Sequence, residues 1–296
     1  MRTFAGVELG GTKIVCGLGT EDGELLERVR LDTEDPGRSL PAILAVLQRF
    51  ESAHGGYSAL GIGTFGPVYL NRNAANFGRI GESPKLAWRG RDLLAYFREK
   101  LSVPVILDTD VTMAAFGEST WGAAAGVSSI VYLTVGTGVG AGVLIDGVPL
   151  HGLLHPEVGH IRVPRATGDD YAGSCPQHGD CVEGLTAGPA ILARWGKSLG
   201  ELPAEHPAFE LTAHYLSQLV ANLVLFYAPE KIVLGGGVMS NVALYPMIRV
   251  RVQALLNGYV ALPEIEQNIE ELIVAPGLGD NAGILGAAAM AMTMAN

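Results

Sequence analysis

Four side chains between residues 160 and 181 are of the types that bind a transition metal. His160, Cys175, His178 and Cys181 follow one another as H-x14-C-x2-H-x2-C. Thiolate sulfur and imidazole nitrogen at such short spacings are the donors that tetrahedral zinc prefers. The alternative is a pair of free cysteines beside solvated histidines. The surrounding segment, 164–184, has little apolar content, so a bound metal would explain how it keeps its shape.

Two glycine-rich turns, each between two predicted strands, have the composition of phosphate-binding loops. The first is Glu8-Leu-Gly-Gly-Thr-Lys13, and the second runs from Thr134 to Gly142. Glycine lets backbone N–H groups approach a phosphate, while threonine hydroxyls and Lys13 add hydrogen bonds and charge. A third turn, Gly235–Gly237, suits a flat ligand lying on the backbone. Ordinary hairpin turns remain the alternative, because glycine also supplies positive φ angles there.

Carboxylates at two places suit phosphoryl transfer to a sugar hydroxyl, which needs a base beside that hydroxyl. Asp108 and Asp110 directly follow a predicted strand, and the residues alone leave both open as the base. Asp110 can also be interpreted as a helix N-cap. Glu157 and His160 flank a turn after Pro156, and a carboxylate can accept two hydrogen bonds from sugar hydroxyls.

Strands and helices alternate along the chain, which favours an α/β fold. Strands are predicted at Phe4–Leu9, Ile14–Leu18, Leu25–Leu31, Leu60–Thr64, Val103–Leu107, Ile130–Val135, Gly140–Ile145, Ile232–Leu234 and Leu272–Val274. Helices are predicted from an N-cap at Ser39 to Ala53, and at Arg91–Leu101, Thr109–Trp121, Pro207–Tyr227, Val242–Leu256 and Gly283–Met294. A plan of strand, glycine and threonine turn, and strand occurs twice, which hints at an internal duplication.

The composition limits the classes of function. The chain has 296 residues, which suggests two domains. A formal charge of −10 argues against a nucleic-acid partner. The longest apolar stretch, Ile284–Ala295, is too short to span a bilayer, and no secretory signal is visible. Only three cysteines are present, so we expect a cytoplasmic protein without a membrane partner.

Taken together, these motifs resemble the ROK family of bacterial sugar kinases and sugar-responsive repressors. The resemblance rests on Glu8–Lys13, Thr134–Gly142, His155–His160 and the cysteine and histidine cluster ending in Glu183. Other stretches resemble the fructokinase branch, and they are Thr64–Pro67, Ser83–Lys85, Asp108–Val111 and Cys175–Gly184. The chain has Glu8 where most of the family has Asp, and Thr109-Asp110 where many members have Asn-Asp. A strand beginning by Phe4 leaves no room for the repressors' DNA-binding module.

The resemblance implies a fold and an activity. The fold is a two-domain actin/hexokinase-like (ribonuclease H-like) α/β ATPase fold with an interdomain cleft. We expect one domain over 1–112, with helix 283–296 packing back on it, and a second over 113–282. The activity is ATP-dependent phosphorylation of a hexose, fructose first. Glucose, mannose or an N-acetylhexosamine are alternative substrates, and a non-catalytic sugar sensor or a nucleotide-gated chaperone is an alternative class.

The resemblance also implies residue roles. Asp110 is the expected catalytic base. Sugar contacts are expected from Gly66, Lys85, Thr109, Asp110, Glu157, His160 and Glu183. ATP, with Mg²⁺, is expected at Gly10, Gly11, Thr12, Lys13, Thr134, Gly136, Thr137, Gly138, Gly188, Pro189, Gly236, Asp280 and Asn281. Zn²⁺ is expected at His160, Cys175, His178 and Cys181, where it would orient the sugar ligands. The expected partners are a hexose and ATP, and a homodimer is left open.

Overall fold

The computed structural model describes residues 2–295, and its contacts group the chain into two compact units. The first unit comprises Met1–Gly126, Gly147–Pro156 and Gly277–Asn296. The second comprises Val127–Asp146 and Glu157–Pro276. The domain boundary after residue 112 stays a prediction, and its outer limits, residues 1 and 296, lie outside the described residues.

The first unit is built on a five-stranded sheet in the order β3-β2-β1-β4-β5. Its strands are β1 (Thr3–Leu9), β2 (Lys13–Thr20), β3 (Leu25–Asp32), β4 (Leu60–Thr64) and β5 (Val105–Thr109). β1, β4 and β5 run parallel, with Leu9, Thr64 and Thr109 level with one another at their carboxyl ends. The segments that follow these three strands therefore share one edge of the sheet, where open α/β sheets bind ligands.

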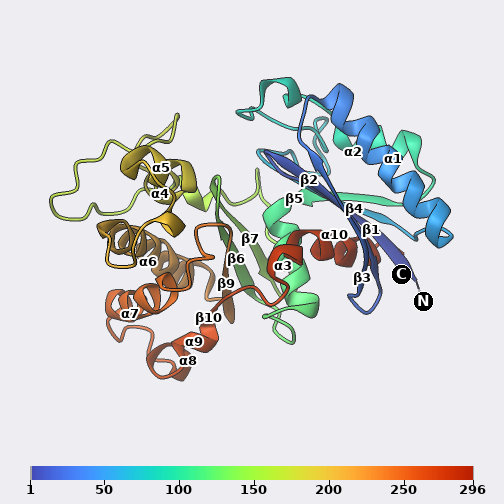
Figure 1. Ribbon diagram of the computed structural model, residues 1–296. Coiled ribbons are helices and arrows are strands. Elements are labelled where there is room, and N and C mark those ends of the chain that lie inside the picture. Colours follow the sequence, from blue (N-terminus) through green and yellow to red (C-terminus); the bar gives the residue numbers. More distant parts are fainter. Residues whose placement is uncertain (1, 296) are drawn as a thin grey trace. The chain divides into compact units, whose positions relative to one another are not determined.

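Helices cover both faces of this sheet (Figure 1). The helices of the unit are α1 (Pro36–His54), α2 (Leu93–Lys100), α3 (Asp110–Trp121) and α10 (Ala282–Met292), with single 3-10 turns η1 (Leu86–Trp88) and η4 (Gly279–Asn281). α1 and α2 lie on one face, and α3 and α10 lie on the other. The predicted N-cap of α1 is wrong: the Asp35 side chain accepts from Gly37 N, whereas the Ser39 hydroxyl accepts from Glu34 N.

α10 approaches the sheet so closely that glycine is required at the contact. A Cβ at Gly6 would lie 2.6 Å from the carbonyl oxygen of Ile284. One at Gly61 would overlap the carbonyl oxygen of Ala287, and one at Gly286 would overlap that of Met113. This contact needs hydrogen in place of a side chain on both partners, because protein interiors are close-packed.

The second sheet has the order β10-β9-β6-β7-β8. Its strands are β6 (Ile130–Val135), β7 (Val139–Ile145), β8 (Val148–Pro149), β9 (Lys231–Gly235) and β10 (Ile273–Val274). β6 pairs antiparallel with β7 and parallel with β9, as β1 pairs with β2 and β4 in the first sheet. The repeated plan seen in the sequence is therefore repeated in strand pairing.

The core of the second unit is formed between its sheet and its helices. The helices are α4 (Val182–Thr186), α5 (Gly188–Trp195), α6 (Pro207–Tyr227), α7 (Leu244–Leu256), α8 (Pro263–Glu266) and α9 (Ile269–Leu272), with 3-10 turns η2 (Val158–His160) and η3 (Leu199–Glu201). The predicted bounds of α6 agree with the structure at both ends. Pro207 occupies the first helical turn, where its missing N–H costs nothing.

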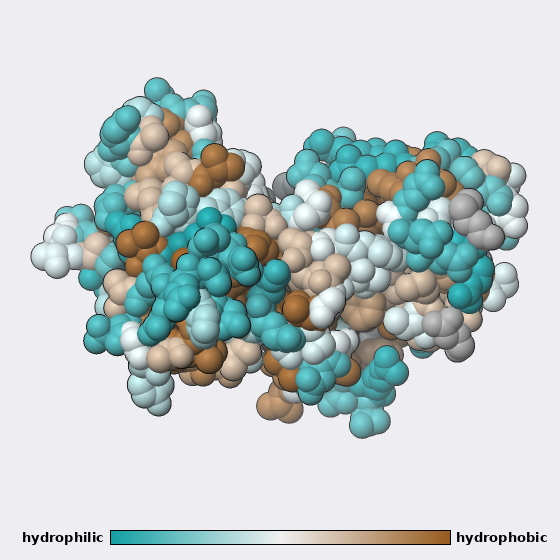
Figure 2. Space-filling view, turned by 90° about the horizontal axis from the view of Figure 1, so that it is seen from below, coloured by the Kyte–Doolittle hydropathy of each residue, from teal (hydrophilic) through white to brown (hydrophobic). Residues whose placement is uncertain are grey.

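The surface carries exposed apolar residues that are dispersed rather than gathered. Leu153, Tyr259 and Val242 are the most exposed of them. On the face shown in Figure 2, small hydrophobic spots are separated by hydrophilic ones. No helix within residues 2–295 has both the length and the apolar composition needed to cross a membrane.

Candidate functional site

The first glycine turn lies directly after β1 and has a fixed backbone. Gly10 N donates to the carbonyl oxygen of Lys13 at 3.0 Å, and the Thr33 hydroxyl donates to the Gly10 carbonyl at 2.8 Å. A Cβ at Gly10 would lie 2.9 Å from the Lys13 carbonyl oxygen, so the turn is closed to larger residues. The turn presents Gly11 and Thr12 at the edge of the sheet that Thr64 and Thr109 share.

Lys85 lies beside this turn. Its Cε is 3.6 Å from the position that a Cβ on Gly11 would occupy, and its own backbone N donates to the buried Ser83 hydroxyl at 3.2 Å. The sequence suggested a sugar contact for Lys85. The structure brings it to the predicted phosphate loop, where its ammonium group adds a second positive charge to that of Lys13.

Asp110 is the first residue of α3, and it is not the N-cap. The Thr109 hydroxyl takes that role, because it accepts from Thr112 N at 3.1 Å. The N-cap interpretation of Asp110 is therefore wrong. Its backbone lies against the end of β4, since a Cβ on Gly63 would be 3.1 Å from the Asp110 Cα. Gly66 follows β4 two residues after Thr64, so it belongs to the same edge as Asp110.

Asp108, the competing carboxylate, is buried and already engaged. Its Oδ1 accepts from Thr109 N at 2.7 Å and lies 3.2 Å from His151 Nε2. Its side chain is only 5% exposed. These contacts favour a structural role for Asp108 at the end of β5.

His155 fixes the segment after β4. Burial lowers the pKa of His155, and its neutral ring accepts a hydrogen bond from Val68 N at 3.3 Å. This contact holds the turn that carries Gly66 and Pro67. The sequence pattern placed His155 in a motif without giving it a role.

Glu118 was noted in the sequence only for its spacing from Asp110. It is fully buried, and its carboxylate accepts from the backbone N of Ala123, Gly277 and Leu278 at 2.7, 2.9 and 3.0 Å. It thereby fixes the chain that leads to Asp280 and Asn281 at the start of α10. A buried acid is costly unless it is hydrogen-bonded in this way, and that was the available signal.

Glu8 and Asp280 form a second acidic group at this edge. Burial raises the pKa of Glu8 against the opposing effect of Lys13, and the charge of Asp280 adds to the rise. A Cβ on Gly283 would lie 2.7 Å from a Glu8 carboxylate oxygen, so Glu8 points toward the start of α10. Two nearby carboxylates suit a hard divalent cation such as Mg²⁺.

In the second unit, three predicted nucleotide segments converge. Gly188 N, at the start of α5, donates to the Gly136 carbonyl at 2.7 Å. A Cβ on Gly136 would lie 3.7 Å from Gly237 N, and Gly236 has φ 90° with its backbone against Val135. Thr134, Thr137, Gly138 and Pro189 adjoin these contacts in the chain. The glycines are required by close backbone approach, whatever ligand they bind.

Glu183 joins this glycine loop to the histidine and cysteine cluster. One of its oxygens accepts from Val139 N at 3.0 Å, and the other lies 4.0 Å from His160 Nδ1. Glu157 lies on the other side of the ring, 4.0 Å from His160 Nε2. Burial, to which the charge of Glu183 adds, raises the pKa of Glu157 to about 7. The three predicted sugar ligands of this unit are thus one group.

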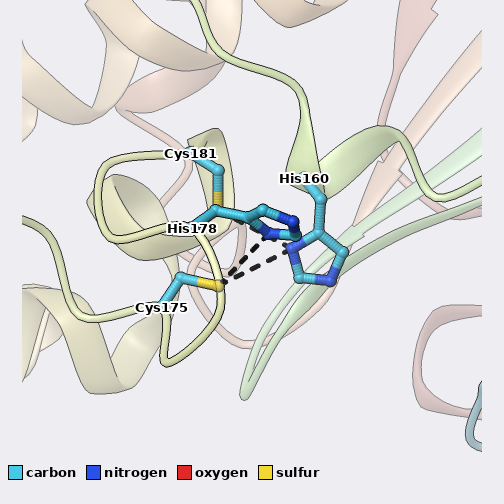
Figure 3. A group of neighbouring side chains, drawn as sticks. All are labelled: His160, Cys175, His178 and Cys181. Atoms are coloured by element: carbon cyan, nitrogen blue, oxygen red, sulfur yellow. Dashed lines mark hydrogen bonds between the residues drawn. The ribbon is translucent and has the colours of Figure 1, made fainter. Parts of the chain in front are cut away.

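The four predicted metal ligands come together (Figure 3). Their donor atoms all lie within 4.8 Å of one another. Cys175 Sγ is 3.8 Å from His160 Nδ1 and 3.7 Å from His178 Nδ1, and Cys181 Sγ is 3.6 Å from His160 Nδ1. Tetrahedral zinc with ordinary bond lengths would place sulfur and nitrogen ligands about 3.6 Å apart. The residues present therefore fit zinc.

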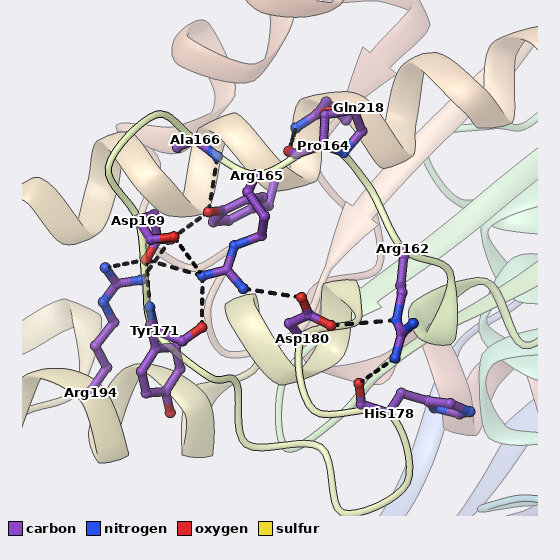
Figure 4. A network of polar contacts seen from close by, with 11 residues as sticks. Arg162, Pro164, Arg165, Ala166, Asp169, Tyr171, His178, Asp180, Arg194 and Gln218 are labelled. Atoms are coloured by element: carbon purple, nitrogen blue, oxygen red, sulfur yellow. Dashed lines mark hydrogen bonds and ion pairs between the residues drawn. The ribbon is translucent and has the colours of Figure 1, made fainter.

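A polar network that the sequence did not reveal holds the segment before these cysteines (Figure 4). Asp169 receives a bidentate ion pair from Arg194, at 3.0 and 2.9 Å, and a short hydrogen bond from Tyr215. Arg165 donates to the carbonyls of Asp169 and Tyr171 and pairs with Asp180 at 3.3 Å. Asp180 precedes Cys181, so the network reaches the metal ligands. These partners are distant in sequence, and no local spacing signalled them.

Comparison with known proteins places the chain in a class. The ROK family pattern matches residues 4–294. A fructokinase of Pediococcus pentosaceus is 40% identical over 95% of this chain and 94% of its own length. A fructokinase of Zymomonas mobilis is 40% identical over 100% and 98%. The ROK hexokinase of Thermus thermophilus has a TM-score of 0.77 at 29% identity, covering 99% of this chain and 98% of its own.

The chain belongs to the ROK family. The family assignment and the α/β hexokinase-like fold predicted from the sequence are confirmed. Another relative by structure is a ROK glucokinase of Streptomyces griseus, solved with glucose and AMPPNP, with a TM-score of 0.76 at 26% identity, over 98% and 99% of the two chains.

Proposed function

We propose that this protein is an ATP-dependent hexose kinase whose preferred substrate is fructose. Asp110 carries the proposal: it is a carboxylate at the carboxyl end of β5, relieved of capping duty by Thr109. Identities of 40% to two fructokinases over nearly the whole chain support fructose. The family also contains glucokinases, one of them 30% identical, so glucose and mannose are the alternative substrates.

In the proposed reaction, Asp110 orients the sugar hydroxyl and accepts its proton as the new P–O bond forms. Glu157 and Glu183 accept hydrogen bonds from other sugar hydroxyls, and Gly66 contacts the sugar through its backbone. Hydroxyl groups are weak nucleophiles at neutral pH, so a correctly placed base contributes about 10²–10⁴-fold in rate. Binding that excludes water protects the phosphoryl group from hydrolysis.

The phosphates of ATP are proposed to bind the glycine loops at Gly10–Lys13 and Thr134–Gly138. Supporting residues on the nucleotide side are Gly188, Pro189, Gly236, Asp280 and Asn281. Lys85 is assigned to the transferred phosphoryl group, because its side chain lies beside Gly11. Glu8 and Asp280 would hold Mg²⁺, which supplies charge neutralisation for the phosphates when bound.

Zn²⁺ is proposed at His160, Cys175, His178 and Cys181. Burial raises the pKa of the Cys181 thiol to about 11, and the nearby Cys175 adds to the rise, so a thiolate there needs a cation beside it. His160 lies between Glu157 and Glu183. A metal that fixes His160 would therefore fix both carboxylates for the sugar without taking part in proton transfer. The cytoplasmic location stays a prediction.

The test is a coupled ADP-release assay with fructose, mannose, glucose and N-acetylglucosamine. We expect the highest kcat/KM with fructose. A preference of about tenfold or more for glucose, equal to 1.4 kcal/mol in transition-state binding, would overturn the choice of sugar but not of class. Binding of a hexose without ADP release from ATP would favour the non-catalytic sensor instead.

A further inference from the structure

A pocket lies in the first unit at β5, the edge strand of its sheet. It encloses about 560 Å³ and is lined by Val105–Asp108, by side chains of α2, α3 and α10, by the chain after β4 and by residues 147–151. None of the residues assigned above to ATP, sugar or zinc lines it. Its volume falls in the range of pockets that hold metabolites of nucleotide size.

The pocket combines apolar walls with a small set of polar groups. The walls are aliphatic and aromatic, among them Phe77, Phe116 and Met290. Asp108 is the polar group most deeply placed, with Oδ1 bonded to Thr109 N and close to His151, while its Oδ2 has no hydrogen bond recorded within residues 2–295. A carboxylate oxygen that lines a pocket accepts hydroxyl groups well.

Two arginines give the pocket its charge. Arg72 and Arg98 both line it, and Arg98 also donates to the Val105 carbonyl at 3.3 Å. With Asp108 ionised and His151 neutral, the formal charge of the lining is positive by one. Guanidinium groups bind phosphate oxygens with a geometry that lysine lacks. The lining therefore favours a ligand with an anionic end, hydroxyl groups and a flat or apolar face.

We propose that this pocket binds a phosphate monoester whose body carries hydroxyl groups, the chemistry that nucleoside monophosphates and sugar phosphates share. Arg72 and Arg98 bind the phosphate, Asp108 accepts a hydroxyl, and the apolar walls cover the face of the base or sugar. Asp108 also bonds Thr109 N, one residue before Asp110. Occupancy of the pocket is thereby linked to the end of β5. The binding itself does not depend on the proposed kinase activity.

Methionine methyl groups provide a local test. Met290 and Met294 line the pocket, whereas Met239 and Met247 belong to the second unit. Protein labelled with ¹³C at the methionine methyl is titrated separately with adenosine 5′-monophosphate, fructose 6-phosphate and inorganic phosphate. Signals are assigned with Met290→Leu and Met294→Leu. We expect saturable shifts of the Met290 and Met294 signals with at least one ester, and which ester binds distinguishes a nucleotide from a sugar phosphate.

Charge reversal is the matched control. Arg72→Glu should weaken ester binding at these methyl groups by about fivefold or more, because the phosphate loses a charge-assisted hydrogen bond. Arg30→Glu makes the same change on β3, at the opposite edge of the sheet, and should leave binding unchanged. The proposal is overturned by an absence of Met290 and Met294 shifts with both esters, by equal weakening in the two variants, or by inorganic phosphate binding as tightly as the esters.

Discussion

The packing of α10 on the first sheet and the segment 164–184 of the second unit reach a fixed shape by opposite means. α10 is apolar and almost wholly buried, and it touches the sheet backbone through Gly6 and Gly61. The other segment has little apolar content and is held by Arg165, Asp169 and the four metal ligands. The first region depends on volume, whereas the second depends on charge and geometry.

This difference predicts how each region fails. Close apolar packing tolerates no added atom, but it needs no ion and no particular pH. A polar segment tolerates solvent, but the loss of one charged partner leaves the others buried and unpaired. Substitutions in the first region should lower the free energy of unfolding, whereas those in the second should also change metal and sugar binding.

The largest effect is expected from Cys181→Ser, because the metal loses a thiolate. Zinc affinity should fall by about 100-fold or more, the thermal midpoint should fall, and the fructose KM should rise since His160 and Glu183 lose their positions. Metal content by elemental analysis, with fructose kinetics, is the measurement. Cys16→Ser is the control: Cys16 is also buried, but it lies in β2 away from the cluster, so zinc should be retained. Full activity of metal-free protein would contradict the account.

The next effect is on stability alone. Gly61→Ala adds a methyl group that overlaps the Ala287 carbonyl oxygen, and both sides of the contact are backbone. We expect a loss of about 3 kcal/mol in unfolding free energy, measured by urea denaturation, with metal content unchanged. Gly152→Ala is the control, since nothing lies within 4 Å of its added Cβ and its φ is not positive. Equal stability of the two variants would show that α10 can move away at little cost.

A smaller effect is expected from Asp169→Asn, which removes the charge that Arg194 and Arg165 share. The unfolding free energy should fall by about 2 kcal/mol. Burial alone would raise the pKa of Asp169, but hydrogen bonds from Arg194 and Tyr215 hold it well below its usual range. The contribution is therefore fully present above about pH 4 and is lost only as the pH falls through the folded-state value. Denaturation at pH 6 and pH 8 should give the same loss, and a loss confined to one of the two would contradict this assignment.

The same contrast explains how much the sequence could predict. Elements with a clear apolar period were predicted closely, such as α6 at Pro207–Tyr227. Motifs whose members are neighbours in the chain were also found, among them the glycine loops and the metal ligands. Helix caps were less certain, because Asp35 and Ser39, or Thr109 and Asp110, are chemically equivalent candidates until the backbone angles are known.

Contacts between distant residues were beyond the sequence. Glu118 binds backbone groups at 277 and 278, and Asp169 binds Arg194 and Tyr215. Neither pairing has a local spacing that would reveal it. Lys85 shows the same limit, since its place beside Gly11 follows from how the chain after β4 returns to the sheet.

The central claim, that Asp110 is the base of a hexose kinase, is tested most directly by the kcat of Asp110→Asn. This change keeps the size and hydrogen-bonding reach of the side chain but removes its basicity, and Thr109 still caps α3. The variant should fold and bind ATP and fructose, with kcat lower by about 100-fold or more. Asp108→Asn, in the same segment but engaged with Thr109 N, should keep much more activity. Near-normal turnover by Asp110→Asn would contradict the account, and the reverse ranking of the two variants would transfer the base to Asp108.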